Sequence, residues 1–344
     1  MTFIQEPYVH RTIALNFEDG VTRFVVCLPG DTIADAAYRH GVNIPLDCRD
    51  GACGTCKSIC ESGTFEMTGY VEEALSTSEA AEGYILTCQT RPLSDCLIRI
   101  PSSSVACNAA DNTVRKARIS RLEMLSASTI GLELEGPEIE TLHFLAGQYA
   151  NLYVPGTNEV RAYSFSSRVS HGKVNFLIRN VPNGKMSAAL SGIAKVGDEI
   201  RYRAPFGSFY LRKVEHPLLM IAGGTGLAPF LAMLEQMANA SASVPIHLLY
   251  GVTREDDVVG LDWLDEFKKR LPTFDYTVTV VDTAVDGRHK GVVTDYLKQS
   301  HFHDGRADLY LCGPPPMVTA VEQYIRDQGM TPASMHFEKF LPST

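Results

Sequence analysis

The sequence predicts a multidomain chain that joins an α+β segment, an antiparallel β-barrel and a parallel α/β sheet. The first hundred residues combine two strand patterns, a short helix and a cysteine-rich loop. Short β-like runs broken by Gly and Pro follow, and the last third alternates apolar strands with helices. We therefore place three domains at residues 1–104, 113–212 and 213–344. The best linker signal runs from Pro101-Ser102-Ser103-Ser104 through Asn108 to Asn112.

The composition describes an ordinary globular chain of 344 residues with 45% hydrophobic residues. No apolar run approaches the roughly 20 residues that span a bilayer. The first residues lack the basic and apolar regions of a signal peptide, and free thiols fit a reducing compartment, so we expect a cytoplasmic protein without a membrane partner. The net charge of −9 opposes binding to nucleic acid. Most of this charge lies in the first hundred residues, where it forms either a solvated surface or a face that steers toward a basic partner.

The first segment opens with two predicted strands and a helix. Alternating residues predict a strand over Thr12–Phe17, and a second strand ends at Leu28. Thr32, followed three residues later by Asp35, predicts a capping box at the start of a short helix that ends at Gly41.

A cysteine-rich loop follows this helix. Four cysteines have the spacing C-x4-C-x2-C plus one distant cysteine, which is the plant-type ligand pattern of a 2Fe–2S cluster: Cys48, Cys53, Cys56 and Cys88. Gly51 and Gly54 let the loop fold tightly, so that backbone N–H groups can point at cluster sulfurs. Zinc is the alternative, although structural zinc loops usually pair their cysteines in two C-x2-C units. With the strands and the helix, the loop predicts the β-grasp fold of plant-type ferredoxins.

The remaining thiols of this segment are interpreted as structural or incidental. Cys60 continues the cysteine pattern, but one loop cannot aim four consecutive thiolates at a plant-type cluster. The same interpretation covers Cys27, Cys96 and Cys107.

The second segment, from about residue 115 to 212, predicts a small antiparallel barrel from short strands such as Gln148–Val154 and Val174–Ile178. Within it, Arg161-Ala162-Tyr163-Ser164 would place a cation and an aromatic ring on one strand face and a hydroxyl on the other. That arrangement suits a flat ring whose pyrophosphate lies across the strand. Gly184-Lys185-Met186-Ser187 has the form of a helix start that could take phosphate. Either string alone is common on protein surfaces.

The third segment predicts a parallel, Rossmann-like α/β sheet. Its strand-like runs are Leu218–Ala222, Ile246–Tyr250, Tyr276–Val281 and Leu309–Cys312. Its helical runs are Gly226–Ala238, Leu261–Lys269, Thr294–Gln299 and Met317–Asp327.

Two strand ends of this sheet carry ligand-binding signals. Gly223-Gly224-Thr225-Gly226 follows the first strand and opens a helix, and ligands of such sheets bind at the carboxyl ends of the strands. The loop lacks the G-x-G-x-x-G spacing of a dehydrogenase fingerprint. Cys312-Gly313-Pro314 follows another strand. Because the ends of parallel strands meet at one edge, we expect Cys312 on the same rim as Gly223.

The order of these motifs resembles the ferredoxin–NADP⁺ reductase superfamily: R-x-Y-S, G-x-x-S, G-G-T-G-x-x-P and C-G-P-P-P-M. With the ferredoxin-like first segment and the ending Phe337-Glu338-Lys339-Phe340, the chain resembles the reductase components of benzoate 1,2-dioxygenases from about residue 12 to residue 341. The resemblance implies an NADH-dependent flavin iron–sulfur oxidoreductase. Electrons would pass from NADH to FAD, to the 2Fe–2S cluster and to a Rieske-type ring-hydroxylating oxygenase in aromatic hydrocarbon catabolism.

The resemblance also implies roles for single residues. Arg161 would pair with the FAD pyrophosphate, Tyr163 would pack on the isoalloxazine, and Ser164 would hydrogen-bond near the reactive flavin nitrogen. Phe340 would cover the other flavin face. The pyrophosphate would lie at Gly184, Lys185, Met186 and Ser187. The nicotinamide dinucleotide would be held by Gly223, Gly224, Thr225, Gly226 and Pro229, and the nicotinamide would be lined by Cys312, Gly313 and Pro314. The implied catalytic residues are Tyr163, Ser164 and Cys312.

One acidic residue favours NADH over NADPH. Asp282 stands where NADP-specific relatives carry a Ser-Arg pair, and a carboxylate there would repel a 2′-phosphate. Arg254 complicates this expectation, but it is followed by three acidic residues, Glu255, Asp256 and Asp257.

The sequence leaves two alternatives open. A reductase of the same build could serve an anthranilate or toluate dioxygenase or a diiron monooxygenase, because the aromatic substrate never touches this subunit. A non-catalytic ferredoxin-like carrier with degenerate nucleotide domains is the second alternative. The intact motifs around Arg161 and Cys312 count against it.

Overall fold

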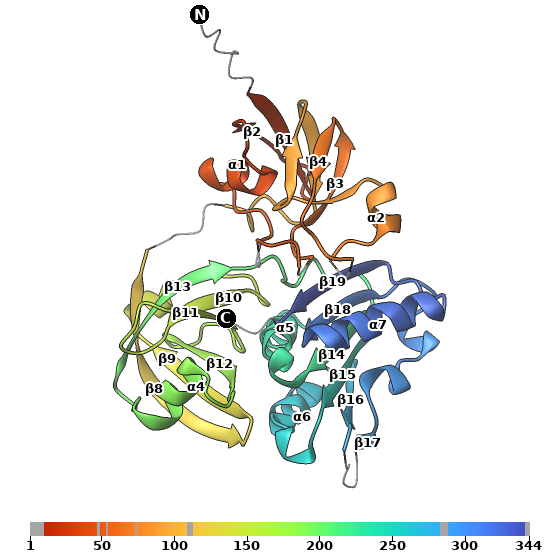
Figure 1. The fold of residues 1–344 in the computed structure, drawn as a ribbon. Coiled ribbons are helices and arrows are strands. Elements are labelled where there is room, and N and C mark those ends of the chain that lie inside the picture. The colour runs from red at the N-terminus through yellow and green to blue at the C-terminus, as the bar shows by residue number, and fades with distance from the viewer. Residues whose placement is uncertain are drawn as a thin grey trace, which may run out of the picture. The chain divides into compact units, whose positions relative to one another are not determined.

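The computed structural model describes residues 10–46, 49–52, 54–72, 74–108, 113–282 and 288–340. The chain divides into two compact units, Met1–Ala110 and Asp111–Thr344, whose elements are labelled in Figure 1. Within the described ranges, no helix combines the length and apolar character that crossing a membrane requires.

The first unit is built on a mixed five-stranded sheet. Its order is β2-β1-β7-β3-β5, from β1 (Arg11–Phe17), β2 (Thr22–Cys27), β3 (Lys57–Ser62), β5 (Tyr84–Leu86) and β7 (Cys96–Ile100). A two-stranded ladder of β4 (Phe65–Met67) and β6 (Thr90–Pro92) and the helices α1 (Ile33–Arg39) and α2 (Thr77–Ala81) complete it. β1 pairs antiparallel with β2 and parallel with β7. The core includes every second residue of β1 and the inner face of α1, so the predicted β-grasp arrangement is confirmed.

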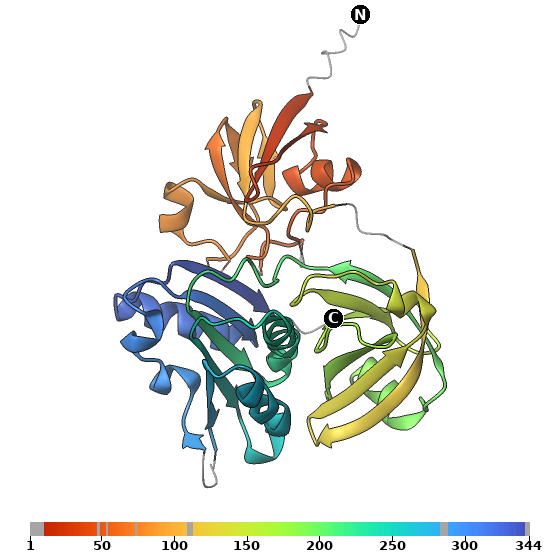
Figure 2. The same cartoon turned by 180° about the vertical axis from the view of Figure 1, so that it is seen from behind.

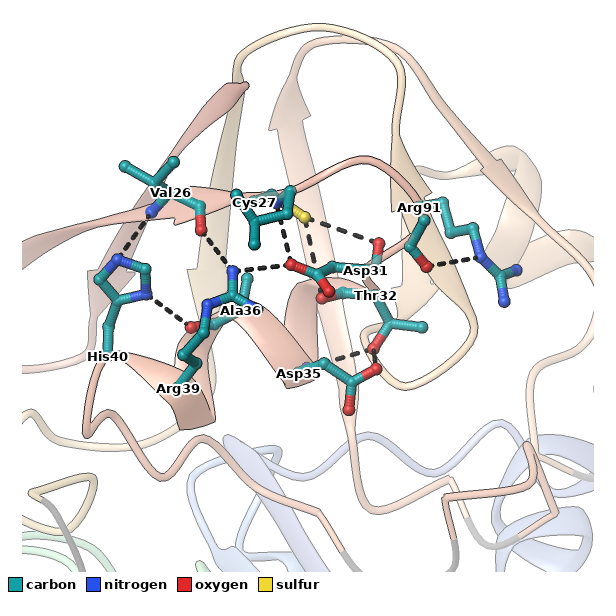
Figure 3. Close-up of polar contacts among 11 residues, drawn as sticks. Val26, Cys27, Asp31, Thr32, Asp35, Ala36, Arg39, His40 and Arg91 are labelled. Carbon is teal, nitrogen blue, oxygen red and sulfur yellow. Dashed lines mark hydrogen bonds and ion pairs between the residues drawn. The ribbon is translucent and has the colours of Figure 1, made fainter. Parts of the chain in front are cut away.

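The first turn of α1 is capped much as the sequence predicts (Figure 3). Thr32 accepts a hydrogen bond from the backbone N–H of Asp35 at 3.1 Å, and its hydroxyl donates to the Asp35 carboxylate at 2.7 Å. The Asp35 carboxylate therefore binds the Thr32 hydroxyl, whereas a full capping box would have it accept from the Thr32 backbone N–H.

The end of α1 covers the outer edge of the sheet (Figure 3). A terminal guanidinium nitrogen of Arg39 donates to the Val26 carbonyl at 2.9 Å, and the Val26 N–H donates to Nε2 of His40 at 3.4 Å. β2 is the edge strand, so these side chains occupy backbone groups that could otherwise pair with another chain. The helix ends at Arg39, slightly before the predicted Gly41.

Thr32→Ala is expected to destabilise the first unit by about 1 kcal/mol, because the first helical turn loses its cap. Urea unfolding followed by the visible absorbance of the cluster would measure this change. Thr22→Ala is the matched control, since Thr22 is exposed on β2; it should shift the free energy of unfolding by less than about 0.5 kcal/mol. Equal shifts for the two variants would contradict the assigned capping role.

The segment after β7 packs on the first unit, although its composition suggested a linker from Pro101. The backbone N–H and the hydroxyl of Ser104 donate to the Asp19 carboxylate at 2.8 and 2.7 Å. Farther on, the Asn43 N–H donates to the carbonyl of the buried Cys107 at 2.9 Å. Ser-rich composition does not reveal such long-range bonds.

The second unit contains the predicted antiparallel barrel. Its sheet runs in the order β11-β10-β13-β8-β9-β12, and every pairing in this sheet is antiparallel. The strands are β8 (Arg115–Ser126), β9 (Thr129–Glu135), β10 (Tyr149–Tyr153), β11 (Val160–Ser164), β12 (Lys173–Arg179) and β13 (Glu199–Phe206). A bridge between Phe165 and Phe176 links the two end strands. The helices of this part are α3 (Pro137–Glu140) and α4 (Lys185–Gly192).

The second unit also contains the predicted parallel sheet, in the order β17-β16-β15-β14-β18-β19. The strands are β14 (Leu218–Gly223), β15 (Ile246–Val252), β16 (Phe274–Val280), β17 (His289–Lys290), β18 (Asp308–Gly313) and β19 (Ser334–Lys339). The helices α5 (Leu227–Asn239) and α6 (Leu261–Arg270) cover one face, and α7 (Pro315–Asp327) covers the other. Figure 2 shows α5 between this sheet and the barrel, where it shares a core with Leu177 and Phe209.

One predicted helix is wrong. Thr294–Gln299 forms no α-helix, because two single 3₁₀ turns, η3 (Val293–Tyr296) and η4 (Gln299–Phe302), cover the region. The Asp295 carboxylate accepts from the Val292 N–H at 2.9 Å and closes the first turn. Leu297 then takes an extended backbone and buries its side chain. Apolar spacing over a few residues does not separate such turns from a helix.

Candidate functional site

Two of the four predicted cluster cysteines lie within the described part of the chain, and their sulfur atoms are neighbours. The Sγ atoms of Cys56 and Cys88 are 3.3 Å apart, and both side chains are buried. Cys56 directly precedes β3, and Cys88 follows β5, which pairs with β3. Cys48 and Cys53 lie outside the described residues.

The backbone around this pair fits a thiolate-bound cluster. Gly51 and Gly54 have φ of +78° and +75°, and a Cβ at Gly51 would stand 2.6 Å from the carbonyl oxygen of Gly69. The loop therefore requires glycine at Gly51, as predicted. The Gln89 side-chain amide lies 3.6 Å from the Cys88 sulfur as a donor. A hydrogen bond from the Cys56 thiol, followed by the one from Gln89, lowers the pKa of Cys88 and favours the thiolate.

The thiol of Cys60 forms a hydrogen bond within its own strand. Its thiol donates to the carbonyl of Ser62 at 3.3 Å within β3, and burial raises its pKa. Both observations agree with the interpretation of Cys60 as a structural thiol.

The strand β11 presents the predicted cation and ring on one face. Arg161 and Tyr163 are half-buried, whereas Ser164, on the opposite face, is buried. The Arg161 guanidinium lies 3.2 Å from the Glu159 carboxylate and donates to the Val160 carbonyl at 2.9 Å. Burial raises the pKa of Tyr163, which therefore stays a neutral phenol.

The start of α4 lies beside β11. Gly184 precedes the helix, and no side chain caps its first turn, so the first backbone N–H groups can serve an anion. The Lys185 ammonium is 2.5 Å from the same Glu159 carboxylate that contacts Arg161. The Ser187 hydroxyl donates to the Arg179 carbonyl at 3.2 Å and accepts from the Val181 N–H. Met186 is buried.

The two glycine-containing strand ends share one rim, as predicted. β14 and β18 are parallel neighbours, with Ala222 paired to Cys312. A Cβ at Gly223 would stand 2.6 Å from the Met317 sulfur and 2.8 Å from the Pro314 ring, so the two turns touch and leave no room for a side chain. The rest of the first turn follows directly, with Gly224, Thr225 and Gly226 in a 3₁₀ turn and Pro229 buried in α5.

Residues from the barrel and the sheet converge on Glu338. The Ser164 hydroxyl donates to Oε2 of Glu338 at 3.4 Å, and the Cys312 thiol lies 4.0 Å from the same oxygen. β19 places Glu338 opposite Cys312 in the parallel register, and only 8% of Glu338 is exposed. Burial, and then the charge of Glu338, raise the pKa of Cys312, so the thiol stays protonated. Phe340 follows, half-buried, and its N–H donates to the Gly313 carbonyl at 2.9 Å.

Glu338 stands in the C-terminal motif Phe337-Glu338-Lys339-Phe340, for which the sequence predicts no role at Glu338. Only the pairing of β19 with β18 brings it to Cys312. The signal in the sequence is a carboxylate within a short run of half-apolar residues, and this run forms β19, a strand that was not predicted.

Acidic and basic residues lie together at the carboxyl ends of β15 and β16. Asp282 is exposed, and its N–H donates to the Thr253 carbonyl at 3.0 Å, which places it near the exposed Arg254. Glu255, expected to surround Arg254, forms an ion pair of 2.7 Å with Arg288. Asp282 therefore lies exposed just after the carboxyl end of β16.

Three family models match successive parts of the chain. Residues 16–93 match a 2Fe-2S iron-sulfur cluster binding domain, residues 116–210 an oxidoreductase FAD-binding domain and residues 220–323 an oxidoreductase NAD-binding domain. The toluate 1,2-dioxygenase electron transfer component of Pseudomonas putida is 51% identical, covering 96% of this chain and 98% of the relative.

The chain belongs to the reductase family of dioxygenase electron transfer components. Two other relatives are the 2-halobenzoate 1,2-dioxygenase component of Burkholderia cepacia, at 46% identity, and the anthranilate 1,2-dioxygenase component of Acinetobacter baylyi, at 38%. Each of these two alignments covers at least 96% of this chain and 98% of the relative. This reductase is thus an oxidoreductase whose cofactors are a 2Fe–2S cluster, FAD and a nicotinamide dinucleotide.

Solved structures agree with the fold of this reductase. A cytochrome P450 reductase from Amycolatopsis is similar with a TM-score of 0.70 and 31% identity, over 97% of this chain and all of that chain. A ferredoxin reductase in carbazole 1,9a-dioxygenase has a TM-score of 0.64 at 24% identity, with 97% and 100% coverage; at this identity the likeness supports the fold alone.

Proposed function

We propose that this reductase takes electrons from NADH and delivers them, through FAD and the 2Fe–2S cluster, to the Rieske-type oxygenase component of benzoate 1,2-dioxygenase. The observation that carries the redox part is the meeting of Ser164 from the barrel and Cys312 from the sheet at Glu338. A partner of this class is supported by relatives that serve dioxygenases of toluate, 2-halobenzoate and anthranilate, all of which are ring carboxylates.

Each part of the proposed site has a physical task. Arg161, Lys185 and the free amides of α4 would hold the FAD pyrophosphate. Tyr163 and Phe340 would cover the two flavin faces. When bound, FAD accepts a hydride from NADH and the cluster carries single electrons.

The groups around Glu338 would orient and protect the reacting parts of the flavin and the nicotinamide. Ser164, held by Glu338, would hydrogen-bond near the reactive flavin nitrogen. Cys312 and the touching glycine turns would form the rim for the nicotinamide. The cluster ligands would be the four cysteines of the predicted pattern: Cys48, Cys53, Cys56 and Cys88.

NADH is the proposed donor because of Asp282. Asp282→Ala is expected to raise kcat/KM for NADPH relative to NADH by about fivefold, which corresponds to removing one like-charge contact of about 1 kcal/mol in water. Steady-state ferricyanide reduction with each nucleotide measures the ratio. The control is Asp262→Ala, which removes a carboxylate from the first turn of α6. An unchanged ratio in the Asp282 variant would place the adenosine ribose elsewhere.

The partner is tested by oxygen uptake. The purified reductase, NADH and the oxygenase component of a benzoate dioxygenase are mixed with and without benzoate, in parallel with toluate and anthranilate oxygenase components and their substrates. Faster coupled turnover with the benzoate component supports the assignment, and faster turnover with the toluate or anthranilate component replaces it. The matches to oxidoreductase FAD-binding and NAD-binding domains count against the non-catalytic carrier.

A further inference from the structure

A single carboxylate bridges the two cations that we assign to the FAD pyrophosphate. One oxygen of Glu159 lies 2.5 Å from the Lys185 ammonium, and the other lies 3.2 Å from the Arg161 guanidinium. Lys185 begins α4 and Arg161 lies on β11, so Glu159 links the helix start to the strand. The hydrogen bond from Lys185, with the charges of both cations, holds the pKa of Glu159 below its ordinary value. The carboxylate is therefore ionised at neutral pH.

The backbone of Glu159 is fixed by the turn between β10 and β11. The Val154 N–H donates to the Glu159 carbonyl at 2.8 Å, and the Glu159 N–H donates to the Thr157 hydroxyl at 3.1 Å. Arg201 in turn donates to the Asn158 side chain at 3.1 Å. The carboxylate thus stands on an anchored turn beside the two cations.

We propose that Glu159 limits the affinity of this reductase for FAD. The proposal rests on the proposed function, which assigns Arg161 and Lys185 to the pyrophosphate. A pyrophosphate at these cations must share their donors with Glu159, and its negative charge is repelled by the carboxylate at close range. Arg161 is the more constrained partner, because 17% of its side chain is exposed against 61% for Lys185. Glu159 therefore competes with the pyrophosphate mainly for the guanidinium N–H donors of Arg161.

The test compares FAD dissociation constants of the full chain, measured by the flavin fluorescence released when the holoprotein is diluted. Glu159→Gln keeps the shape of the side chain and removes its charge. It is expected to lower the dissociation constant by about fivefold, and the difference should shrink at high ionic strength. The matched control is Glu199→Gln, which removes an exposed carboxylate paired with Lys116 at 2.8 Å in the same barrel; its dissociation constant should equal that of the wild type.

Arg161→Gln separates failure of this inference from failure of the site. If Arg161→Gln weakens FAD binding but Glu159→Gln does not tighten it, the inference is overturned and the proposed site stands. If neither variant changes FAD binding, the pyrophosphate does not lie at these cations, and both the site and the inference are overturned. Tightening in Glu159→Gln together with weakening in Arg161→Gln supports both.

Discussion

Cys88→Ser is expected to remove the 2Fe–2S cluster and to leave NADH-dependent ferricyanide reduction in place. The serine hydroxyl does not ionise at neutral pH, so it cannot replace the thiolate that faces Cys56 at 3.3 Å. Electron delivery to the oxygenase should fall by at least about 100-fold, because even indirect damage to a metal site costs 10–100-fold. The dye can take electrons from the flavin, and the flavin and nucleotide domains lie in a separate unit with its own cores.

Cys60→Ser is the control for this prediction. Cys60 lies in the same segment, and its thiol binds the Ser62 carbonyl, so its replacement should keep the visible spectrum of the cluster and the electron delivery. Loss of the cluster in both variants would mean that Cys60 belongs to the ligand set. Equal loss of dye reduction and oxygenase reduction in Cys88→Ser would mean that the two units do not act separately.

Glu338→Gln is expected to slow flavin reduction by NADH by roughly 10- to 100-fold, which corresponds to losing one hydrogen bond to a charged group of about 1.5–3 kcal/mol. The amide lacks the negative charge that holds the Ser164 hydroxyl at 3.4 Å, so Ser164 is less well positioned toward the flavin. Anaerobic stopped-flow bleaching of the flavin absorbance measures the rate. The FAD content should stay unchanged, because Arg161 and Lys185, which are assigned to the pyrophosphate, keep their charges in this variant.

Asp308→Asn is the matched control for Glu338→Gln. Asp308 is a similarly buried carboxylate at the other end of β18, where Ser334 and His216 bind it. Its replacement should leave the rate of flavin reduction unchanged. An equal slowing in both variants would show that the loss of any buried carboxylate charge in this sheet slows flavin reduction. A normal rate in Glu338→Gln would remove Glu338 from the proposed site.

Local patterns were enough to predict most elements of this reductase. Alternation predicted the paired strands of the first unit, and the switch from short strands to strand–helix alternation predicted the barrel and the parallel sheet. The glycine turn at Gly223 and the Cys312 turn were predicted on one rim because parallel strand ends meet at one edge. The failures were also local: Thr294–Gln299 was too short for its spacing to separate a helix from two turns, and the Ser-rich segment near Ser104 gave no sign of its bonds to Asp19.

The sequence by itself determined the chemistry of this protein, because spacing within one loop or one strand fixes which side chains can serve one ligand. The Cys56 loop, the Arg161–Ser164 strand and the Gly223 turn are motifs of this kind. Only the tertiary structure decided which distant groups meet. β19 brings Glu338 to Cys312, the contact of the barrel with the sheet brings Ser164 to Glu338, and the turn before β11 places Glu159 between two cations. Such contacts depend on strand register and on the packing of separate elements, which leave no periodic pattern along the chain.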